Sequence, residues 1–382
     1  MENNEHKKPV VLQILPELNQ GGVEVGTTEI AEFLKSRGIK NYVASQGGRY
    51  VYNLKKVGVK HFTLPLKTKN PIKLYLNSKK LEKVIRENGI NIVHARSRAP
   101  AWSTYWAAKR AGVKFLTTFH GTYGLGPLGI KKFYNKIMTY GALVIAISTH
   151  IKQHIIKNYH VDESKIRLIH RCVDVNRFDQ TKISQERMIK LIHQCNIPND
   201  RPIILSTGRL TSWKGQHLLI EALGKLPHKN FYCIFVGDAQ GRESYVTKLK
   251  SLIEEYNLEG NVTFFEHTMH MPELMMLSSV IVSTALEPEA FGRMAAEGQA
   301  MGKIVLASNI GGSLDSVKDG ITGRLFKSGD VQALTEALEW ALNLKGKEKE
   351  TLSANAIKNA RENFTKELMC EKTLQVYHEL LK

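Results

Sequence analysis

The chain has 382 residues, of which 42% are hydrophobic and 24% charged, which is ordinary for a globular protein in water. This length exceeds what a single core usually holds, so two domains are expected. The absence of any run of eighteen apolar residues excludes a membrane-spanning helix. The four cysteines, Cys172, Cys195, Cys233 and Cys370, have no metal-binding or redox spacing and fit a reducing cytoplasm.

The net charge of +18 comes entirely from the first half of the chain. Residues 1–170 hold 28 Lys and Arg against 10 Asp and Glu, whereas residues 171–382 hold 26 of each. A basic half joined to a neutral half indicates that the basic half meets an anionic partner, which could be a nucleic acid, an anionic membrane surface or a phosphorylated glycan. The alternative is a solvated basic surface without a partner.

In chain order, the first half alternates apolar runs with helical patterns. The run 10–15 predicts a buried strand, and Gly21 and Gly22 separate it from a helix over 23–37. Paired glycines let a backbone approach a phosphate closely, although the absence of GxGxxG disfavours a nicotinamide enzyme. Further strands are expected over 41–45, 90–94, 115–119, 143–148 and 166–170, and further helices over 79–88 and 101–111.

Cationic and imidazole side chains follow several of these strands. His94, Arg96, Arg98 and His120 all lie at the carboxyl ends of predicted strands. In open α/β sheets this edge binds ligands. A lone histidine there is more often structural than catalytic, but four such groups at one edge favour a binding site.

The second half repeats the alternation after a mixed, polar crossover over 171–200. Its expected strands are 202–207, 231–236, 262–265, 280–284 and 303–307, and its expected helices are 216–223, 245–256, 290–301, 331–344, 351–362 and 366–381. Strand–helix alternation in both halves predicts an α/β protein with two Rossmann-like domains, whose parallel sheets face a central cleft that holds the ligand.

Two patterns in the second half suggest a site. Arg209 and Lys214 follow a strand on one loop, where a guanidinium and an ammonium suit a diphosphate. The stretch EPEAFGRMAAE (287–297) reads as a strand-to-helix turn that places Glu297 two turns into a helix, roughly 12 Å from Glu289. Carboxylates so far apart cannot share a metal ion, but they can hold two ends of a hydroxyl-rich ligand. Free amides at the helix start would attract an anion between them.

With these motifs, the chain resembles the retaining glycosyltransferases of family 4, which have the GT-B fold. Glu289 and Glu297 match the family's Glu-x7-Glu motif, and Arg209 and Lys214 match its Arg-x4-Lys pair. The stretches HARSRAPAW, TTFHGTYG and LTSWKGQ are similar to lipopolysaccharide core glycosyltransferases of Gram-negative bacteria. The chain departs from the family in having Asp315 where Glu is usual, and in the residues His170-Arg171-Cys172.

The resemblance implies that the two halves of the chain bind different substrates. Residues 1–170 would form an acceptor-binding domain onto which a C-terminal helix, 366–382, packs back, and residues 178–365 would bind a nucleotide-sugar. The implied donor-binding residues are Gly21, Gly22, Arg209, Lys214, Glu289, Ala290, Phe291, Gly292 and Glu297. The implied catalytic residues are His120, Arg209, Lys214 and Glu289. The implied acceptor-binding residues are Arg96, Arg98 and Tyr123.

No metal ion or other cofactor is expected, because the two clamp cations would neutralise the departing diphosphate. The expected partners are a nucleotide-sugar, a lipid-linked or lipopolysaccharide-type acceptor and the anionic inner-membrane surface, but not nucleic acid. The expected location is the cytoplasm, with peripheral attachment to the inner membrane.

Three alternatives stay open. A sugar-nucleotide epimerase has the same fold and would need no acceptor. A nucleic-acid-binding protein would explain the charge, but Trp102, Tyr105 and Trp106 fall at the helical spacing typical of a core. A nonenzymatic scaffold would not need the clamp or the two glutamates. The donor sugar, its base and the accepting hydroxyl are not indicated by the sequence.

Overall fold

The computed structural model describes residues 8–19, 21–266 and 270–382. The chain forms two compact units. The first combines Met1–Arg171 with the C-terminal segment Lys366–Lys382, and the second is Cys172–Thr365. No helix in the described part of the chain is long and apolar enough to cross a bilayer.

The first unit is built on a seven-stranded parallel sheet with the strand order β3-β2-β1-β4-β5-β6-β7. All four residues of the central strand β1, Val11–Ile14, are buried, because helices cover both faces of the sheet. Its one polar member, Gln13, satisfies its amide by donating to the Thr27 carbonyl (3.1 Å). The other strands are β2 (Asn41–Ser45), β3 (Lys60–Thr63), β4 (Ile92–Ala95), β5 (Lys114–Phe119), β6 (Leu143–Ala146) and β7 (Ile166–Leu168).

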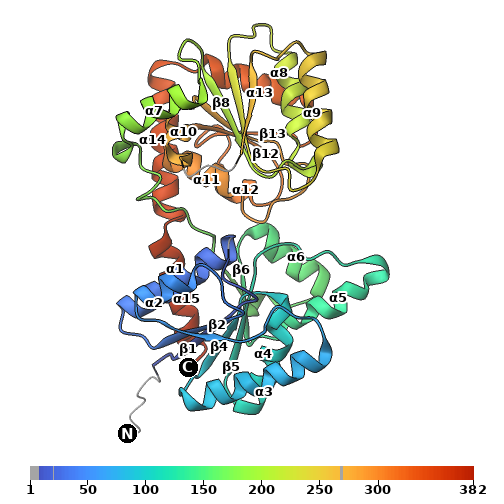
Figure 1. The fold of residues 1–382 in the computed structure, drawn as a ribbon, viewed down its shortest axis with the longest axis vertical. Coiled ribbons are helices and arrows are strands. Elements are labelled where there is room, and N and C mark those ends of the chain that lie inside the picture. Colours follow the sequence, from blue (N-terminus) through green and yellow to red (C-terminus); the bar gives the residue numbers. More distant parts are fainter. Residues whose placement is uncertain (1–7, 20, 267–269) are drawn as a thin grey trace. The chain divides into compact units, whose positions relative to one another are not determined.

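Helices from both ends of the chain pack on this sheet. The last helix, α15 (Lys366–Glu379), lies beside α1 (Gly22–Ser36), as Figure 1 shows. Elsewhere α3 (Pro71–Glu87) packs along α4 (Arg98–Ala111). The remaining helices of this unit are α2 (Val51–Lys56), α5 (Ile130–Asn135) and α6 (Thr149–Tyr159).

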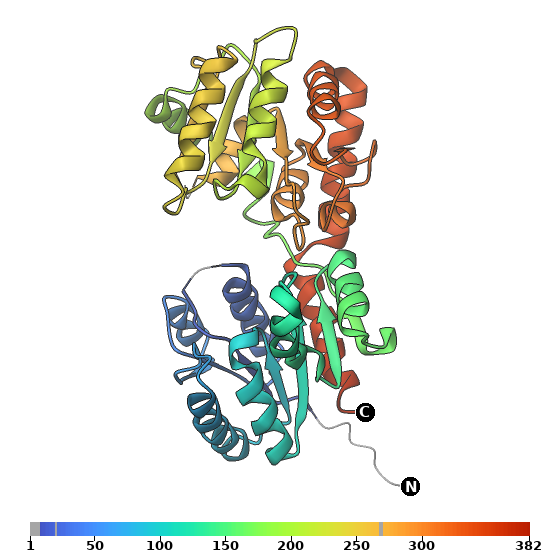
Figure 2. The same ribbon diagram turned by 90° about the vertical axis from the view of Figure 1, so that its right-hand side faces the viewer.

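The second unit has a six-stranded parallel sheet in the order β10-β9-β8-β11-β12-β13. Its helices cover both faces (Figure 2), with α8, α9 and α13 in one layer and α10, α11 and α14 in the other. The strands are β8 (Ile203–Thr207), β9 (Tyr232–Val236), β10 (Val262–Phe265), β11 (Val280–Ser283), β12 (Ile304–Ser308) and β13 (Arg324–Phe326). The helices are α7 (Gln185–Cys195), α8 (Gln216–Gly224), α9 (Glu243–Glu255), α10 (Met271–Leu277), α11 (Arg293–Ala300), α12 (Ser313–Ser316), α13 (Val331–Asn343) and α14 (Gly346–Asn363). The prediction of two parallel α/β domains is confirmed.

A buried polar network joins α15 to the first sheet. Tyr377, on α15, is fully buried, and its hydroxyl lies 2.8 Å from Nδ1 of His94 on β4. Nε2 of His94 lies 2.7 Å from the Thr118 hydroxyl on β5. Burial holds the pKa of His94 well below its usual range, so the imidazole is neutral and both of its nitrogens are satisfied. His94 is therefore part of the core rather than of a binding edge.

We expect Tyr377→Phe to lower the free energy of unfolding by about 1–3 kcal/mol, because one buried nitrogen of His94 loses its partner. Urea denaturation followed by circular dichroism measures this change. Tyr52→Phe is the matched control, since Tyr52 lies in the same unit and is 73% exposed. Equal stability of the two variants would mean that the Tyr377 hydroxyl does not hold α15 to the sheet.

Candidate active site

The loop after β8 carries both predicted clamp cations. Arg209 and Lys214 lie on the segment between β8 and α8, which ends in a 3-10 turn over Ser212–Lys214. The Trp213 ring lies under both charges, 4.7 Å from Nζ of Lys214 and 5.9 Å from the Arg209 guanidinium. Aromatic faces attract cations, so Trp213 positions this pair, which the sequence did not reveal.

Lys214 reaches across to the neighbouring strand end. Its Nζ lies 2.5 Å from Oε1 of Glu289, and the two side chains are only 18% and 15% exposed. The ion pair thus joins two of the four residues implied to be catalytic. Because a Lys–Glu pair so little exposed is weakly screened by water, both charges are held in fixed positions.

Gly311 and Gly312 pack closely against the backbone of the turn that carries Glu289. Gly311 and Gly312 follow β12, and the Gly312 amide donates to the Glu289 carbonyl (2.7 Å). A Cβ on Gly311 would come within 2.6 Å of that carbonyl oxygen, and one on Gly312 would collide with the Phe291 backbone. Phe291 itself is buried, and its ring packs edge-on against Phe364 at 5.4 Å. Gly311 and Gly312 therefore shape the turn by allowing close backbone packing.

The helix that follows this turn starts later than predicted. Gly292 has φ +74, in the left-handed region, and α11 begins only at Arg293. The prediction of a helix over 290–301 is wrong at its start, and Glu297 lies about one turn into α11 rather than two. The helix's free amides consequently begin at Arg293, not at Phe291 and Gly292.

Glu297 is enclosed beside a basic residue. Its side chain is 12% exposed, and Oε1 accepts from Nε of Arg293, one turn earlier (2.8 Å). Burial raises the pKa of Glu297, while the Arg293 charge acts in the opposite direction. One of its carboxylate oxygens is thus engaged, and the carboxylate suits hydroxyl donors.

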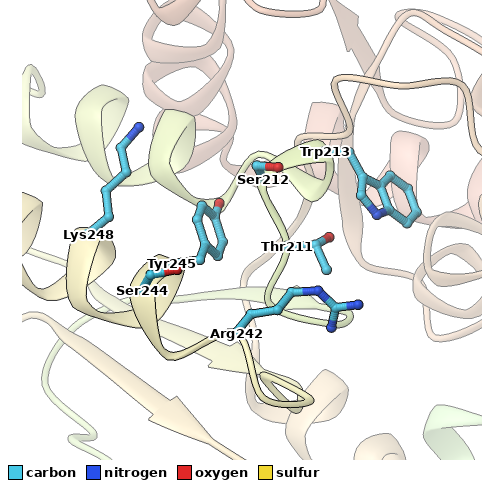
Figure 3. A pocket seen from close by; sticks show the side chains of 7 residues that line it. All are labelled: Thr211, Ser212, Trp213, Arg242, Ser244, Tyr245 and Lys248. Carbon is cyan, nitrogen blue, oxygen red and sulfur yellow. The ribbon is translucent and has the colours of Figure 1, made fainter.

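The loop between β8 and α8 forms part of the wall of a pocket. The pocket is lined by Thr211, Ser212, Trp213, Arg242, Ser244, Tyr245 and Lys248. Figure 3 shows Tyr245 and Arg242 facing Ser212 and Thr211. The Thr211 hydroxyl oxygen is buried without a partner in the described part of the chain. This pocket adds cations and hydroxyls next to Lys214.

In the first unit, the paired glycines begin α1. Gly21 has φ +130 and stands at the N-terminal end of the helix, which starts at Gly22. The Gly22 carbonyl accepts from the Arg171 guanidinium, which also lies against Gly26. The sequence indicated Arg171 only as a departure from the family pattern, and the structure places its guanidinium against α1.

The three residues predicted to bind the acceptor fall into two groups. Arg98 stacks on the Tyr123 ring at 4.2 Å and donates to Oδ1 of Asn135 (2.9 Å). Burial raises the pKa of Tyr123 to about 12, so its hydroxyl stays protonated. Arg96 instead points into a separate pocket that it shares with His120. Arg96 and Arg98 are only two positions apart in the sequence, but their side chains contact different groups.

Comparison with known proteins agrees with this geometry. The family model for glycosyl transferases group 1 matches residues 188–363, and the model for glycosyltransferase family 4 matches residues 20–177. A solved glycosyltransferase from Rickettsia africae ESF-5 is 39% identical, with a TM-score of 0.91 over 98% of this chain and 99% of that one. The chain belongs to glycosyltransferase family 4.

Two further relatives of this family 4 member are less similar to it. HepE from Anabaena, solved in complex with UDP, has a TM-score of 0.84 at 23% identity and covers 96% of this chain and 99% of its own. It shows the shared GT-B fold. The capsular polysaccharide biosynthesis glycosyltransferase CapM of Staphylococcus aureus is 26% identical over 242 residues, which is 63% of this chain and 62% of CapM. The match thus spans about three fifths of that curated relative.

Within this family 4 chain, the second unit brings four of the predicted site residues to one edge of its sheet. Arg209 and Lys214 follow β8, Glu289 follows β11 and Glu297 lies on α11. Ala290, Phe291 and Gly292 form the turn between the two glutamates, with Phe291 serving as a buried anchor. Trp213 and Arg242 were missed because a loop tryptophan and an isolated arginine have no distinctive spacing.

Proposed function

We propose that this glycosyltransferase moves a sugar from a nucleotide-sugar to a glycan or lipid-linked acceptor with retention at the anomeric carbon. The observation that carries the proposal is the convergence of Lys214, Arg209 and Glu289 at the carboxyl edge of the second sheet. The UDP bound by the fold neighbour HepE supports a nucleotide donor. Arg209 and Lys214 neutralise the charge that grows on the leaving diphosphate.

When the donor binds, its diphosphate replaces Glu289 as the partner of the Lys214 ammonium. A diphosphate carries more negative charge than one carboxylate and competes for the ammonium. Glu289, once released, accepts hydrogen bonds from hydroxyls of the donor sugar, and Glu297 accepts from the ribose diol. Front-face attack, with the leaving phosphate as the base, needs no enzyme nucleophile, and His120 lies on the sugar or acceptor side.

The proposal is tested with a panel of nucleotide-sugars, first for thermal stabilisation and then for transfer to an envelope extract. Transfer with an unchanged anomeric configuration, read by NMR, is the expected result. Conversion of the nucleotide-sugar in the absence of any acceptor would instead indicate the epimerase. An inverted product would remove the retaining mechanism.

We expect transfer to continue in excess chelator, because the two clamp cations replace a divalent ion at the diphosphate. The measurement is the initial rate with EDTA against the rate with added magnesium, after dialysis of the protein against chelator. Activity that disappears in EDTA and returns with magnesium would contradict this expectation.

We further propose a lipopolysaccharide-type or other cell-envelope acceptor, which the protein meets at an anionic membrane surface. The relative CapM, named for capsular polysaccharide, supports an envelope glycan. The first unit offers a surface that suits such a membrane, because exposed apolar and basic side chains gather on α2, on α3 and on the segment between these helices. The apolar ones are Tyr52, Ile72, Tyr75 and Leu76, and the exposed lysines are Lys55, Lys56, Lys60, Lys67, Lys69, Lys73, Lys79 and Lys80.

We expect the full chain to sediment with vesicles that contain anionic lipid, and less so as salt shortens the Debye length from ~10 Å at 0.1 M to ~3 Å at 1 M. Reversing Lys73, Lys79 and Lys80 to Glu should weaken this binding by about tenfold or more. The control reverses Lys190, Lys225 and Lys250 of the second unit, all exposed. Equal losses in both triple variants, or binding indifferent to salt, would remove α3 as the docking surface.

A further inference from the structure

The first turn of α11 carries a positive charge in a place where a helix does not favour one. The helix starts at Arg293, and its first turn holds no acidic residue. Because the N-terminus of a helix carries a partial positive charge, a cation there is unfavourable. Glu297 lies four residues further on, and a cation that precedes its acid at this spacing is the less favourable order for an ion pair on a helix. The stability of α11 therefore does not explain an arginine at this position.

Arg293 and Glu297 nevertheless form a close ion pair. Nε of Arg293 donates to Oε1 of Glu297 over 2.8 Å. The arginine side chain is 46% exposed and the glutamate side chain 12% exposed, so a guanidinium with access to water holds a carboxylate that is enclosed. Hydrogen bonds between ionised partners are about twice as strong as those between neutral groups. Arg293 therefore sets the direction in which the carboxylate of Glu297 points.

Arg293 also favours the ionised form of this carboxylate. Burial raises the pKa of Glu297, whereas the charge of Arg293, its hydrogen bond and the charge of Arg177 lower it. Arg293, on the same helix, lowers this pKa more than Arg177, which lies in the segment that precedes the 3-10 turn Gln180–Lys182. An ionised carboxylate only accepts hydrogen bonds, whereas a protonated one holds a hydroxyl donor of its own. The ionised form therefore suits the two hydroxyl groups of a ribose.

We propose that Arg293 is a positioning residue, which holds Glu297 for the ribose of the donor nucleotide and makes the site discriminate ribose from 2′-deoxyribose. This inference rests on the proposed nucleotide-sugar donor and adds a residue to its binding site. A site built to hydrogen-bond a hydroxyl group rejects an analogue that lacks it, because the enclosed acceptor is then left unpaired. Departures from local helix preferences are expected at functional sites, and Arg293 is such a departure.

The test measures the dissociation constants of UDP and 2′-deoxy-UDP by calorimetry with the full chain. GDP and ADP, each with its 2′-deoxy counterpart, are measured in the same way, because all three nucleotides share the ribose. We expect the native protein to bind the ribonucleotide about tenfold or more tightly, since one hydrogen bond to a charged group is lost in the analogue. Arg293→Gln should remove most of this preference by weakening the ribonucleotide alone, and Arg293→Lys, which keeps the charge, should restore part of it.

The pH dependence of binding is a second measurement. UDP affinity, taken relative to that of 2′-deoxy-UDP with the same phosphates, should fall as the pH drops through the pKa of Glu297, because the ionised form accepts from the diol. Without the Arg293 charge the effect of burial is less opposed, so the pKa of Glu297 is higher and the loss of affinity starts at a higher pH. In steady-state kinetics KM for the donor should rise more than kcat falls, since the ribose lies away from the bond that breaks.

Lys358→Gln is the matched control. Lys358 and Glu362 form an ion pair of the same spacing on α14, where the side chains are 70% and 60% exposed, so this variant should bind both nucleotides as the native protein does. Equal affinities of the native protein for UDP and 2′-deoxy-UDP, or equal weakening of both in Arg293→Gln, would overturn the proposal. So would a ribose preference that Arg293→Gln leaves unchanged, although the donor site itself would then stand. A native protein that binds none of the three nucleotides would count against the proposed donor, and this inference would fall with it.

Discussion

Lys214→Ala should lower kcat/KM for sugar transfer by a factor on the order of 10²–10³, which corresponds to the loss of one preorganised charge contact at the leaving group. The structure adds a second cost, because Glu289, whose side chain is only 15% exposed, loses the ammonium that lies 2.5 Å away. Steady-state kinetics with the identified donor measure the effect, and Arg209→Ala should give a loss of similar size.

The matched control is Lys225→Ala, which removes an exposed lysine from the same unit. Its kinetics should equal those of the native protein, and the circular dichroism spectra and melting curves of both variants should stay native-like. Near-normal turnover in Lys214→Ala would remove the ammonium from the mechanism. Restoration of activity in Lys214→Arg would show that the positive charge, rather than the lysine itself, is required.

Gly312→Ala should lower the free energy of unfolding by about 1–3 kcal/mol, the usual cost of forcing an extra methyl group into a packed site. The backbone of Gly312 has φ −71, which any residue adopts, so the whole effect is steric. The new Cβ collides with the Phe291 backbone, which cannot yield as a flexible side chain would. Because Glu289 and Glu297 flank Phe291, transfer should also fall by at least about tenfold, since small displacements of positioned groups are expensive.

Gly260→Ala is the steric control for this prediction. A Cβ at Gly260 meets nothing within 4 Å in the described ranges of the chain, so both stability and transfer should be unchanged. Differential scanning calorimetry gives the first quantity and initial rates give the second. If Gly312→Ala matched Gly260→Ala in both, close packing of the Gly311–Gly312 segment on the Glu289 turn would not be what positions the glutamates.

The alternation of apolar runs and helical patterns predicted both sheets because each central strand is buried on both faces. It missed β3 and β13, the edge strands Lys60–Thr63 and Arg324–Phe326, since edge strands bury less and lack a continuous apolar run. The start of α11 was misplaced because Ala, Met and Glu favour helix on either side of Gly292, and only the left-handed backbone there delays it.

Spacing located the site residues but not their partners. The Lys214–Glu289 pair joins residues 75 positions apart, and Arg171 meets Gly22 across 149 positions, distances at which no local pattern operates. The sequence also placed His94 with Arg96 and His120 as one group at a strand edge. Their hydrogen bonds separate them. Both ring nitrogens of His94 are paired, with Tyr377 and Thr118, whereas Nε of Arg96 and Nε2 of His120 have no partner among the residues that the structure describes.

The first unit is assembled from two stretches of chain, with all 194 residues of Cys172–Thr365 inserted between them. During synthesis at the ribosome, the sheet of the first unit emerges long before α15. Until residues 366–382 follow, α15 does not cover α1, and Nδ1 of His94 lacks the Tyr377 hydroxyl as its partner. The second unit is continuous and can finish folding while the first is still incomplete. Closing the first unit joins residues 283 positions apart, a contact that slows folding because it is so non-local. A stop codon just after the second unit would therefore leave the second unit complete. The first unit, although it lies upstream of the stop codon, would lack α15.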